Sequence, residues 1–189
     1  MGAEEFQQVV AAAAQGDEDA FAALWRAHQP ALLRYLRVLA PSAAEDLASE
    51  AWLVVARQLG RFRGDEGGFR GWLVEIARRQ AMDWRRRHTR RPVVPLPPEL
   101  LPDQAAADDP AAAALEALST QAALALIAAL PPDQAEVVTL RVVVGLDTGQ
   151  VAALLGKRRG AVRVLAHRGL RRLARLLAPP QPARGGVTP

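Results

Sequence analysis

Cysteine is absent from this chain of 189 residues, and aromatic side chains make up only 5% of it. Without cysteine the chain forms neither a disulfide framework nor a thiolate zinc site, which is compatible with a reducing compartment. No apolar stretch approaches the roughly 18 residues that span a bilayer, and the opening MGAEEFQQ carries acid where a secretory signal carries base. We therefore expect a cytoplasmic protein that does not insert into membranes.

Residue clusters typical of enzyme active sites are also missing. The three histidines, His28, His88 and His167, lack metal-ligand spacing, and there is no phosphate-cradling glycine loop. Asp65 and Glu66 lie in a glycine-rich loop, where they make a poor acid/base pair. We expect no enzymatic activity, no metal and no cofactor.

The residues that are abundant favour helices. Half of the chain is hydrophobic, mostly Ala, Leu and Val, which suits helices better than a β-sandwich. Residues 92–114, PVVPLPPELLPDQAAADDPAAAA, contain proline and acid but no base, as is typical of a flexible linker. We therefore predict an all-α protein with small helical domains at 1–91 and 115–178, joined by the linker at 92–114 and followed by a disordered tail at 179–189.

Helical periodicity in the first domain comes in three runs. Apolar residues recur over 21–39, where Pro30 predicts a kink or a fresh start. The sequence SAAE at 42–45 predicts a capping box that opens a second helix over about 43–59. After a glycine-rich break, a third helix resumes at residue 69 and runs into a basic stretch that ends at 91.

The second domain begins with two further helices. Residues 115–130 predict one that ends at the two prolines 131 and 132, and residues 134–144 predict another that stops at Gly145. The valine-rich end of the second segment also suits a strand, but its short length and its place between helices favour helix. Basic residues outnumber acidic ones from 131 to 178, so this domain favours polyanions.

Residues 148–167 have the turn chemistry of a helix-turn-helix. Asp147 and Gln150 have the spacing of a helix cap and its reciprocal partner. With Thr148 as the first position, Ala152 is fifth, where only a small side chain lets the two helices approach. Gly156 is ninth, at a turn that requires a positive φ.

The second helix of this motif separates apolar from basic side chains. Its predicted apolar stripe comprises Val162, Leu165, Leu170, Leu173 and Leu177. Arg159, Arg163 and His167 follow one another on another side. From there an arginine can pair with guanine in a major groove, and other basic residues can neutralise phosphates. A solvated face on a simple helical hairpin would carry the same charges, but the turn residues favour DNA binding.

A second basic cluster lies at the end of the first domain. It consists of Arg78, Arg79, Arg85, Arg86 and Arg87, interleaved with Trp72 and Trp84. Arginines beside aromatic rings are typical of single-strand binding, although basic residues also suit the C-terminal end of any helix. For Trp72 core packing is favoured over base contact, and for Trp84 both remain open. The charges on the second helix, by themselves, are ordinary surface charges.

The order of these segments resembles the extracytoplasmic-function sigma factors, the smallest class of bacterial sigma-70-type factors. The matching phrases are AEDLASEAWLVVARQLGRFRGDEGGFRGWL, a basic helix end, a linker, and LPPDQAEVVTL before the helix-turn-helix. The resemblance implies a region 2 domain at 1–91 and a region 4 domain at 115–178. It further implies that the chain binds core RNA polymerase, directs it to promoter DNA and has an anti-sigma factor as a partner.

By position, the resemblance implies three sets of site residues. Asp46, Glu50 and Arg57 would bind the clamp helices of the largest polymerase subunit. The minus-ten element would be melted and recognised by Arg61, Arg63, Phe69, Arg78, Arg79, Asp83, Trp84, Arg86 and Arg87. The minus-thirty-five element would be read by Lys157, Arg158, Arg159, Arg163, His167 and Arg168. Arg79 stands where relatives often carry asparagine, so the family's base preference at the minus-ten element does not transfer.

Two other functional classes require features that differ from those of a sigma factor. A dimeric helix-turn-helix regulator that binds operator DNA without core polymerase requires a ligand pocket or phospho-acceptor in the N-terminal half. An RNA-processing enzyme requires a metal or an acid/base site. The sequence displays neither feature, and the second cluster of basic and aromatic residues, which suits nucleic-acid binding, favours the sigma factor.

Overall fold

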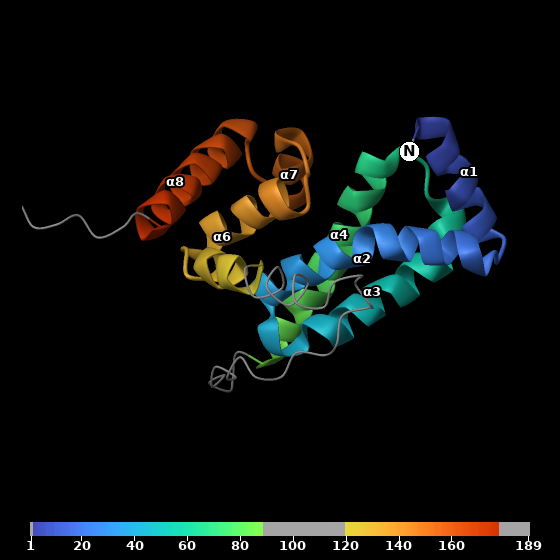
Figure 1. Cartoon of the computed structure of the whole chain (residues 1–189), viewed down its shortest axis with the longest axis horizontal. Coiled ribbons are helices and arrows are strands. Elements are labelled where there is room, and N and C mark those ends of the chain that lie inside the picture. Colours follow the sequence, from blue (N-terminus) through green and yellow to red (C-terminus); the bar gives the residue numbers. More distant parts are fainter. Residues whose placement is uncertain (1, 89–119, 178–189) are drawn as a thin grey trace, which may run out of the picture.

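The computed structural model describes residues 2–88 and 120–177, and helices form all the regular structure within these ranges (Figure 1). The N-terminal part contains α1 (Ala3–Ala14), α2 (Glu18–Leu39), α3 (Ala44–Gln58) and α4 (Glu66–His88). The C-terminal part contains a helical stretch at 120–128, then α6 (Pro132–Val138), η3 (Thr139–Val143), α7 (Thr148–Leu155) and α8 (Arg159–Leu177). The predicted all-α class is confirmed. The predicted linker at 92–114 and tail at 179–189 lie outside the described residues.

The central helix of the N-terminal part is α2, against which α1, α3 and α4 all pack. Its buried side chains are Leu24, His28, Leu32, Tyr35 and Leu36. They lie on both sides of Pro30, which is inside the helix. The predicted fresh start at Pro30 is therefore wrong. Burial of one continuous stripe against three helices outweighs the single backbone hydrogen bond that proline removes.

The start of α3 also differs from the prediction. Pro41 opens a short 3-10 turn, η1 (Pro41–Ala43), and Ala43 then takes the N-cap position of α3 without a side-chain hydrogen bond. The predicted capping box is therefore wrong, because the turn puts Ser42 before the cap. Glu45 pairs instead with Arg37 at 3.1 Å. The predicted extent of the helix is confirmed to within one residue at each end.

Aromatic rings fill the space between α1, α2 and the start of α4. Phe69 is fully buried, and its ring centroid lies 5.7 Å from that of Phe6 and 5.4 Å from that of Phe62. The Gln7 side chain on α1 donates a hydrogen bond to the Gly64 carbonyl oxygen, so α1 contacts the loop before α4 as well. This packing holds the loop and the first turns of α4 in place.

The side of α8 that packs inward differs from the predicted stripe. It consists of Val162, Leu165, Ala166, Gly169 and Leu173. Leu170 and Leu177 are 47% and 68% exposed, so the prediction is wrong for these two residues. A five-residue step from Leu165 to Leu170 turns past the packed side, whereas Gly169 completes a four-residue step.

Gly169 lies where α8 approaches α6 most closely. A Cβ atom at Gly169 would come within 2.6 Å of Val138 Cγ2, and Val138 is itself buried. Overpacking lowers the free energy of unfolding by about 1–3 kcal/mol. Alanine has a higher helix propensity than glycine, which offsets about 1 kcal/mol of this loss. We therefore expect Gly169→Ala to lower the free energy of unfolding by up to about 2 kcal/mol in a urea titration.

The matched control for this substitution lies on the same helix. A Cβ at Gly160 would meet no heavy atom within 4 Å, so Gly160→Ala is expected to leave stability unchanged or to raise it by at most about 1 kcal/mol. A Gly169→Ala protein as stable as Gly160→Ala would contradict the close approach of α8 to α6.

The two parts of the chain pack against each other. Leu146, in the loop before α7, is 1% exposed and belongs to the same buried cluster as Leu32 of α2 and Val74 of α4. η3 and α6 contact α2, and α7 contacts α4. The hydrophobic core is therefore continuous from the N-terminal to the C-terminal part.

Candidate nucleic-acid and polymerase interfaces

The helix-turn-helix geometry predicted from the turn residues is present. The Asp147 Oδ1 atom accepts hydrogen bonds from the backbone amides of Gly149 and Gln150, and the Gln150 Oε1 atom accepts one from the Asp147 amide at 2.8 Å. Gly156 ends α7 in the left-handed conformation with φ +62°. Ala152 and Val162 are buried between α7 and α8. The capping box, the turn and the first packing residues are thus confirmed.

The capping carboxylate makes this motif sensitive to acid. The pKa of Asp147 lies below its ordinary value because the Gln150 amide donates to the carboxylate, with further lowering from the Gly149 amide and the nearby positive charge of Arg159. A carboxylate whose folded pKa is lowered contributes stability above its unfolded pKa, about 3.8, and loses that contribution as the pH falls through the folded value.

We expect Asp147→Ala to lower the melting temperature at pH 7, because α7 loses its cap. The difference from the wild-type protein is expected to stay constant above the unfolded pKa of about 3.8 and to shrink as the pH falls below it. Asp147→Asn is the control, since its amide oxygen still caps the helix but does not titrate in this range. A difference in melting temperature that stays constant with pH would exclude the capping carboxylate as its source.

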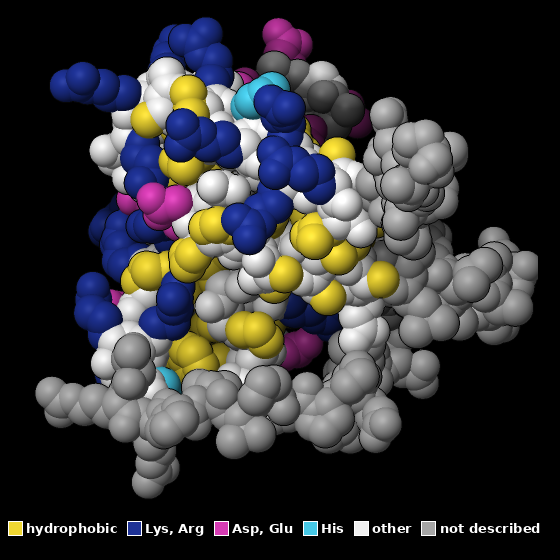
Figure 2. Space-filling model, turned by 90° about the vertical axis from the view of Figure 1, so that its left-hand side faces the viewer, with side chains coloured by type: hydrophobic (Ala, Val, Ile, Leu, Met, Phe, Trp, Pro, Cys, Tyr) yellow, Lys and Arg dark blue, Asp and Glu magenta, His cyan; other side chains and the backbone are white. Residues whose placement is uncertain are grey.

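The outer surface of α8 carries the side chains predicted to read DNA. Arg158, Arg159, Arg163, His167 and Arg168 are exposed, and Lys157 is half-buried in a 3.1 Å ion pair with Asp133. Figure 2, which views the molecule from the side of α8, shows Lys and Arg side chains gathered over one part of this face with hydrophobic side chains among them. Sequence reasoning missed Val164, which is 47% exposed beside Arg163.

Arg159 has a position distinct from the other arginines of α8. A Cβ atom at Gly149 would come within 2.9 Å of the Arg159 Nη2 atom, so the guanidinium lies over the first turn of α7. It also lies close enough to Asp147 to contribute to the lowered pKa of that carboxylate. Arg159 therefore packs against α7, the first helix of the helix-turn-helix, while Arg163 and His167 project from the next turns of α8.

A cleft of about 620 Å³ opens beside the loop between α3 and α4. Its walls include Arg61, Phe62, Arg63 and Trp72 from the N-terminal part and Gln150 and Leu154 from α7. Trp72 is half-buried and stacks on Phe62 with ring centroids 5.2 Å apart. One side of the Trp72 ring is therefore packed against Phe62, as the sequence favoured, while the residue also forms part of a basic cleft.

The loop before α4 is held by its own hydrogen bonds. The Asp65 carboxylate accepts a hydrogen bond from the Gly68 amide at 2.7 Å, which satisfies one free amide at the start of α4. The Arg63 Nη1 atom donates to the carbonyl oxygens of Gly60 and Phe62. Arg61 and Arg63 are exposed, whereas Phe69 is fully buried and has no surface available for contact.

The remaining predicted minus-ten residues lie along α4. Arg79 is exposed and pairs with Glu75 at 3.1 Å, and Asp83 pairs with Arg86. Trp84 is half-buried and stacks on His88 with centroids 4.5 Å apart. Arg87 is exposed and donates to the Asp83 carbonyl oxygen. Arg78 differs, because its Nε atom lies 2.7 Å from Glu136 of the C-terminal part.

The predicted polymerase contacts share the outer side of α3. Asp46, Glu50 and Arg57 are all exposed. Leu53 lies between them at helical spacing and is 56% exposed, which sequence reasoning did not single out. Leu53 therefore adds one exposed apolar side chain to this otherwise charged side of α3.

Within residues 2–88 and 120–177, no group of His, Cys, Asp or Glu side chains is arranged to hold a metal ion. Within the same ranges, no helix combines the length and the apolar character that crossing a membrane requires.

Family models and curated relatives agree on one family. The sigma-70 region 2 model matches residues 24–91, and the sigma-70 region 4 model matches residues 120–173. The chain is 37% identical over 172 residues to the ECF RNA polymerase sigma factor BldN of Streptomyces coelicolor, covering 90% of this chain and 65% of BldN. It is 36% identical over 180 residues to the ECF RNA polymerase sigma factor SigD of Mycobacterium tuberculosis, covering 92% of this chain and 84% of SigD.

Two solved structures share the fold. CnrH, in complex with the cytosolic domain of CnrY, superposes with a TM-score of 0.60 at 24% identity and covers 89% of this chain and 94% of CnrH. RpoE of Bartonella quintana, in complex with the anti-sigma factor NepR, gives a TM-score of 0.61 at 21% identity and covers 81% of this chain and 93% of RpoE. The match to SigD spans most of both chains, and the helix-turn-helix geometry agrees with it. The chain therefore belongs to the extracytoplasmic-function (ECF) family of RNA polymerase sigma factors.

Proposed function

We propose that this chain binds core RNA polymerase and directs it to promoters with separate minus-ten and minus-thirty-five elements. The observation that carries the proposal is that one sigma-family chain has two distinct surfaces suited to nucleic acid. They are the outer side of α8 and the region 2 wall of the cleft beside α4. Region 2 is assigned to residues 1–91, the linker to 92–114, region 4 to 115–178 and the tail to 179–189.

Region 4 is proposed to place α8 in the major groove of the minus-thirty-five element. Arg163 and His167 project from the exposed side, where an arginine can pair bidentately with guanine. Val164 offers an apolar contact for a thymine methyl group. Lys157, Arg158, Arg159 and Arg168 are assigned to phosphates or to the edge of the site, since phosphate contacts position a protein on DNA without reading its sequence.

Region 2 is proposed to hold the unpaired minus-ten strand along α4 and the cleft. The region 2 wall of the cleft combines two cationic side chains, Arg61 and Arg63, and one acid, Glu75, with the Trp72 ring. Cations beside an aromatic ring suit phosphates and unstacked bases. The strand contacts proposed along α4 are Arg78, Arg79, Asp83, Trp84, Arg86 and Arg87. Phe69 contributes by holding the loop from inside, because its ring is buried.

The outer side of α3 is proposed to dock on the clamp helices of the largest polymerase subunit. Asp46, Glu50 and Arg57 supply charged contacts around the apolar Leu53. Burial of an exposed leucine at a protein interface contributes about 1–2 kcal/mol, which corresponds to roughly 5-fold to 30-fold in affinity.

We expect Leu53→Ala to weaken binding of the chain to core polymerase by roughly 5-fold to 30-fold in a fluorescence titration. Leu176→Ala is the matched control, because Leu176 is 52% exposed but lies near the end of α8. Equal affinities for the two variants would remove α3 from the proposed docking surface.

Three further properties belong to the same proposal. The chain acts in the cytoplasm, where core polymerase and promoter DNA are found. It has no catalytic activity of its own, and the polymerase performs the chemistry. RpoE is found in complex with the anti-sigma factor NepR, and CnrH with the cytosolic domain of CnrY. We assign an anti-sigma partner to this chain by the same family relation.

The deciding experiment is transcription by purified core polymerase on a genomic promoter library with and without the full chain. The proposal expects transcripts that start at discrete promoters only when the chain is present. An operator-binding regulator would instead protect a palindromic site by itself and yield no promoter-specific transcript, and that result would overturn the proposal.

A further inference from the structure

We propose that the α2–α4 surface of region 2 is a docking surface for this chain's own region 4, and that docking competes with binding of the minus-ten strand. The docked arrangement is then the state of the free chain, and the strand and region 4 exclude one another. The competition rests on the proposed function, whereas the docking does not.

The polar centre of the docked surface is a triad of Glu136, Arg78 and Tyr35. The Glu136 Oε1 atom accepts a hydrogen bond from the Arg78 Nε atom at 2.7 Å and from the Tyr35 hydroxyl at 3.1 Å. Glu136 belongs to α6, Arg78 to α4 and Tyr35 to α2, so a single carboxylate joins region 4 to two helices of region 2. Hydrogen bonds to an ionised group are stronger than those between neutral groups.

The three side chains of this triad are largely shielded from water. Tyr35 is fully buried, and the side chains of Arg78 and Glu136 are 28% and 15% exposed. Burial raises the pKa of Tyr35 well above its ordinary value, and the negative charge of Glu136 raises it further. The hydroxyl therefore keeps its proton and remains a donor to Glu136. Removal of one member would leave a partly buried charge or hydroxyl without its partner, which is costly.

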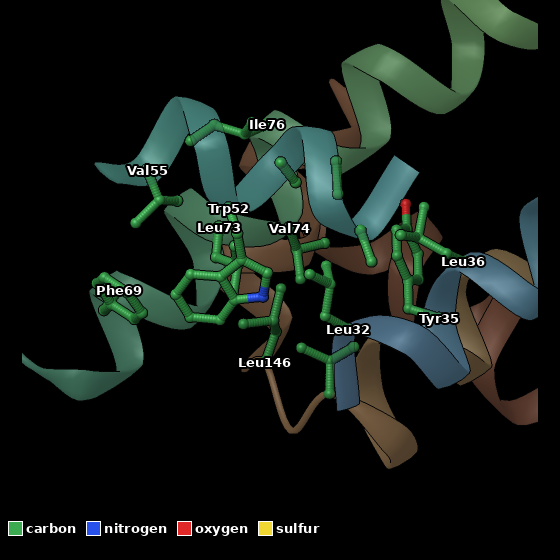
Figure 3. Close-up of a cluster of buried hydrophobic side chains, with 14 of the residues drawn as sticks. Leu32, Tyr35, Leu36, Trp52, Val55, Phe69, Leu73, Val74, Ile76 and Leu146 are labelled. Carbon is green, nitrogen blue, oxygen red and sulfur yellow. The ribbon is translucent and has the colours of Figure 1, made fainter. Parts of the chain in front are cut away.

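Apolar contacts surround the triad. Val137, Leu140 and Leu146 of region 4 are buried to within 1% exposure in the same cluster as Leu32 and Leu36 of α2. Figure 3 shows Leu146 within this cluster together with Leu32, Leu36 and Tyr35. If region 4 moved away, these apolar side chains would be exposed to water, so hydrophobic burial favours the docked state.

A third contact lies at the basic cleft. The Gln150 side chain, which also belongs to the capping box of α7, donates a hydrogen bond to the Gly67 carbonyl oxygen at 3.0 Å. Gln150 and Leu154 of α7 line the same cleft as Arg61 and Trp72. Part of the proposed strand-binding cleft is therefore walled by region 4 itself.

Docking and strand binding require Arg78 to pair with different groups, the Glu136 carboxylate and a DNA phosphate. The Arg78 Nε–H group already donates a hydrogen bond to the Glu136 carboxylate, and a phosphate near this guanidinium would be repelled by the like charge of that carboxylate. A DNA strand whose phosphate pairs with Arg78 must therefore displace region 4 from α4. Because coupling between two binding events is reciprocal, capture of the strand by region 2 releases region 4, and docking of region 4 weakens strand binding.

The docking is tested by a distance measurement in the full chain. The chain has no cysteine, so Ala11→Cys and Ala174→Cys, both at exposed positions, attach spin labels to α1 and α8 only. We expect one narrow distance distribution for the free chain, a broad distribution at longer distance for Glu136→Arg, and recovery of the narrow one for Arg78→Glu combined with Glu136→Arg. Tyr35→Phe keeps the ring in the core and is expected to broaden the distribution partially. An unchanged distribution in both Glu136→Arg and Tyr35→Phe would overturn the docking.

The competition is tested by anisotropy with a fluorescein-labelled, random-sequence single-stranded DNA. Asp133→Arg, on the same helix as Glu136, makes the same change of charge without touching region 2, and it also releases Lys157 from its ion pair. It therefore measures at least the gain in DNA binding that comes from charge alone. We expect Glu136→Arg to bind the DNA at least about fivefold more tightly than Asp133→Arg, as coupling between sites of this kind produces. Equal affinities for these two variants, with the spin labels showing an opened chain, would overturn the competition.

Arg78→Ala separates this inference from the proposed function. If the variant opens the chain and binds the DNA no more tightly than Asp133→Arg, both the docking and the role of Arg78 in strand binding are supported. If it binds as tightly as Glu136→Arg, Arg78 makes no strand contact, and the proposed minus-ten role of that residue fails while the docking stands.

Discussion

Replacement of Phe69 by alanine is expected to lower the free energy of unfolding by about 3–5 kcal/mol, the range for loss of a buried aromatic ring. Phe69 has no exposed surface. Its ring packs within 6.3 Å, between centroids, of Phe6, His28, Phe62, Trp72 and Trp52. Truncation would leave a cavity that α1, α2 and α4 border together, and the surrounding rigid rings have little freedom to fill it.

The measurement is urea unfolding followed by tryptophan fluorescence, because Trp52 and Trp72 both lie beside the ring. Phe21→Ala is the control. Phe21 is half-buried at the edge of the same core, with its centroid 5.7 Å from that of Trp52, so a smaller loss is expected. If Phe69→Ala left stability unchanged but abolished single-strand binding, Phe69 would be a DNA contact and the buried arrangement of its ring would be wrong.

Features that depend on a few neighbouring residues were predictable from the sequence. The Asp147 and Gln150 capping box, the left-handed Gly156 and the small Ala152 each follow from a local conformational requirement, and all three are present. The helix ends near Gly145 and Pro131 are local in the same way. Local rules therefore suffice for the helix-turn-helix, but they did not predict α1 (Ala3–Ala14) or the start of α4 at Glu66, inside the glycine-rich stretch.

Predictions failed where a longer-range contact or a neighbouring turn decided the outcome. Ser42 has the spacing of a helix cap, but the 3-10 turn that begins at Pro41 moves the start of α3 past it. Leu170 fits an apolar repeat, yet the closest approach of α6 and α8 selects Gly169. Tyr35 and Glu136 are 101 positions apart, so their hydrogen bond has no signal in local spacing.

The candidate sites show the same division. Family resemblance indicates Asp46, Glu50 and Arg57, but only burial shows that Leu53 is left exposed among them. Charge and spacing indicate Arg78 as a strand contact, but its ion pair with Glu136 depends on how region 4 packs against region 2. The sequence thus identifies the chemical type of a surface, and the packing determines which of its side chains are available.

Arg163→Ala is expected to weaken use of the minus-thirty-five element by about 1–3 kcal/mol, which is roughly 5-fold to 150-fold in promoter binding by the polymerase holoenzyme. Arg163 is exposed on α8 and has no ion-pair partner among the described residues. Its substitution therefore removes the proposed DNA contact without breaking an ion pair among the described residues. The loss is expected only on promoters with guanine at the contacted position, since bidentate pairing distinguishes that base.

Two further variants separate base reading from charge in this prediction. Arg163→Lys keeps the positive charge but lacks the planar fork that pairs with guanine, so it should lose most of the discrimination and retain the general attraction to DNA. Arg175, also exposed but in the last turn of α8, is the control. Arg175→Ala should weaken binding equally for all sequences and reduce the slope of log affinity against log salt by about 1. If Arg163→Ala behaves like Arg175→Ala, with a uniform loss and a smaller salt slope, Arg163 contacts phosphate, and base reading belongs to other residues on the exposed side of α8.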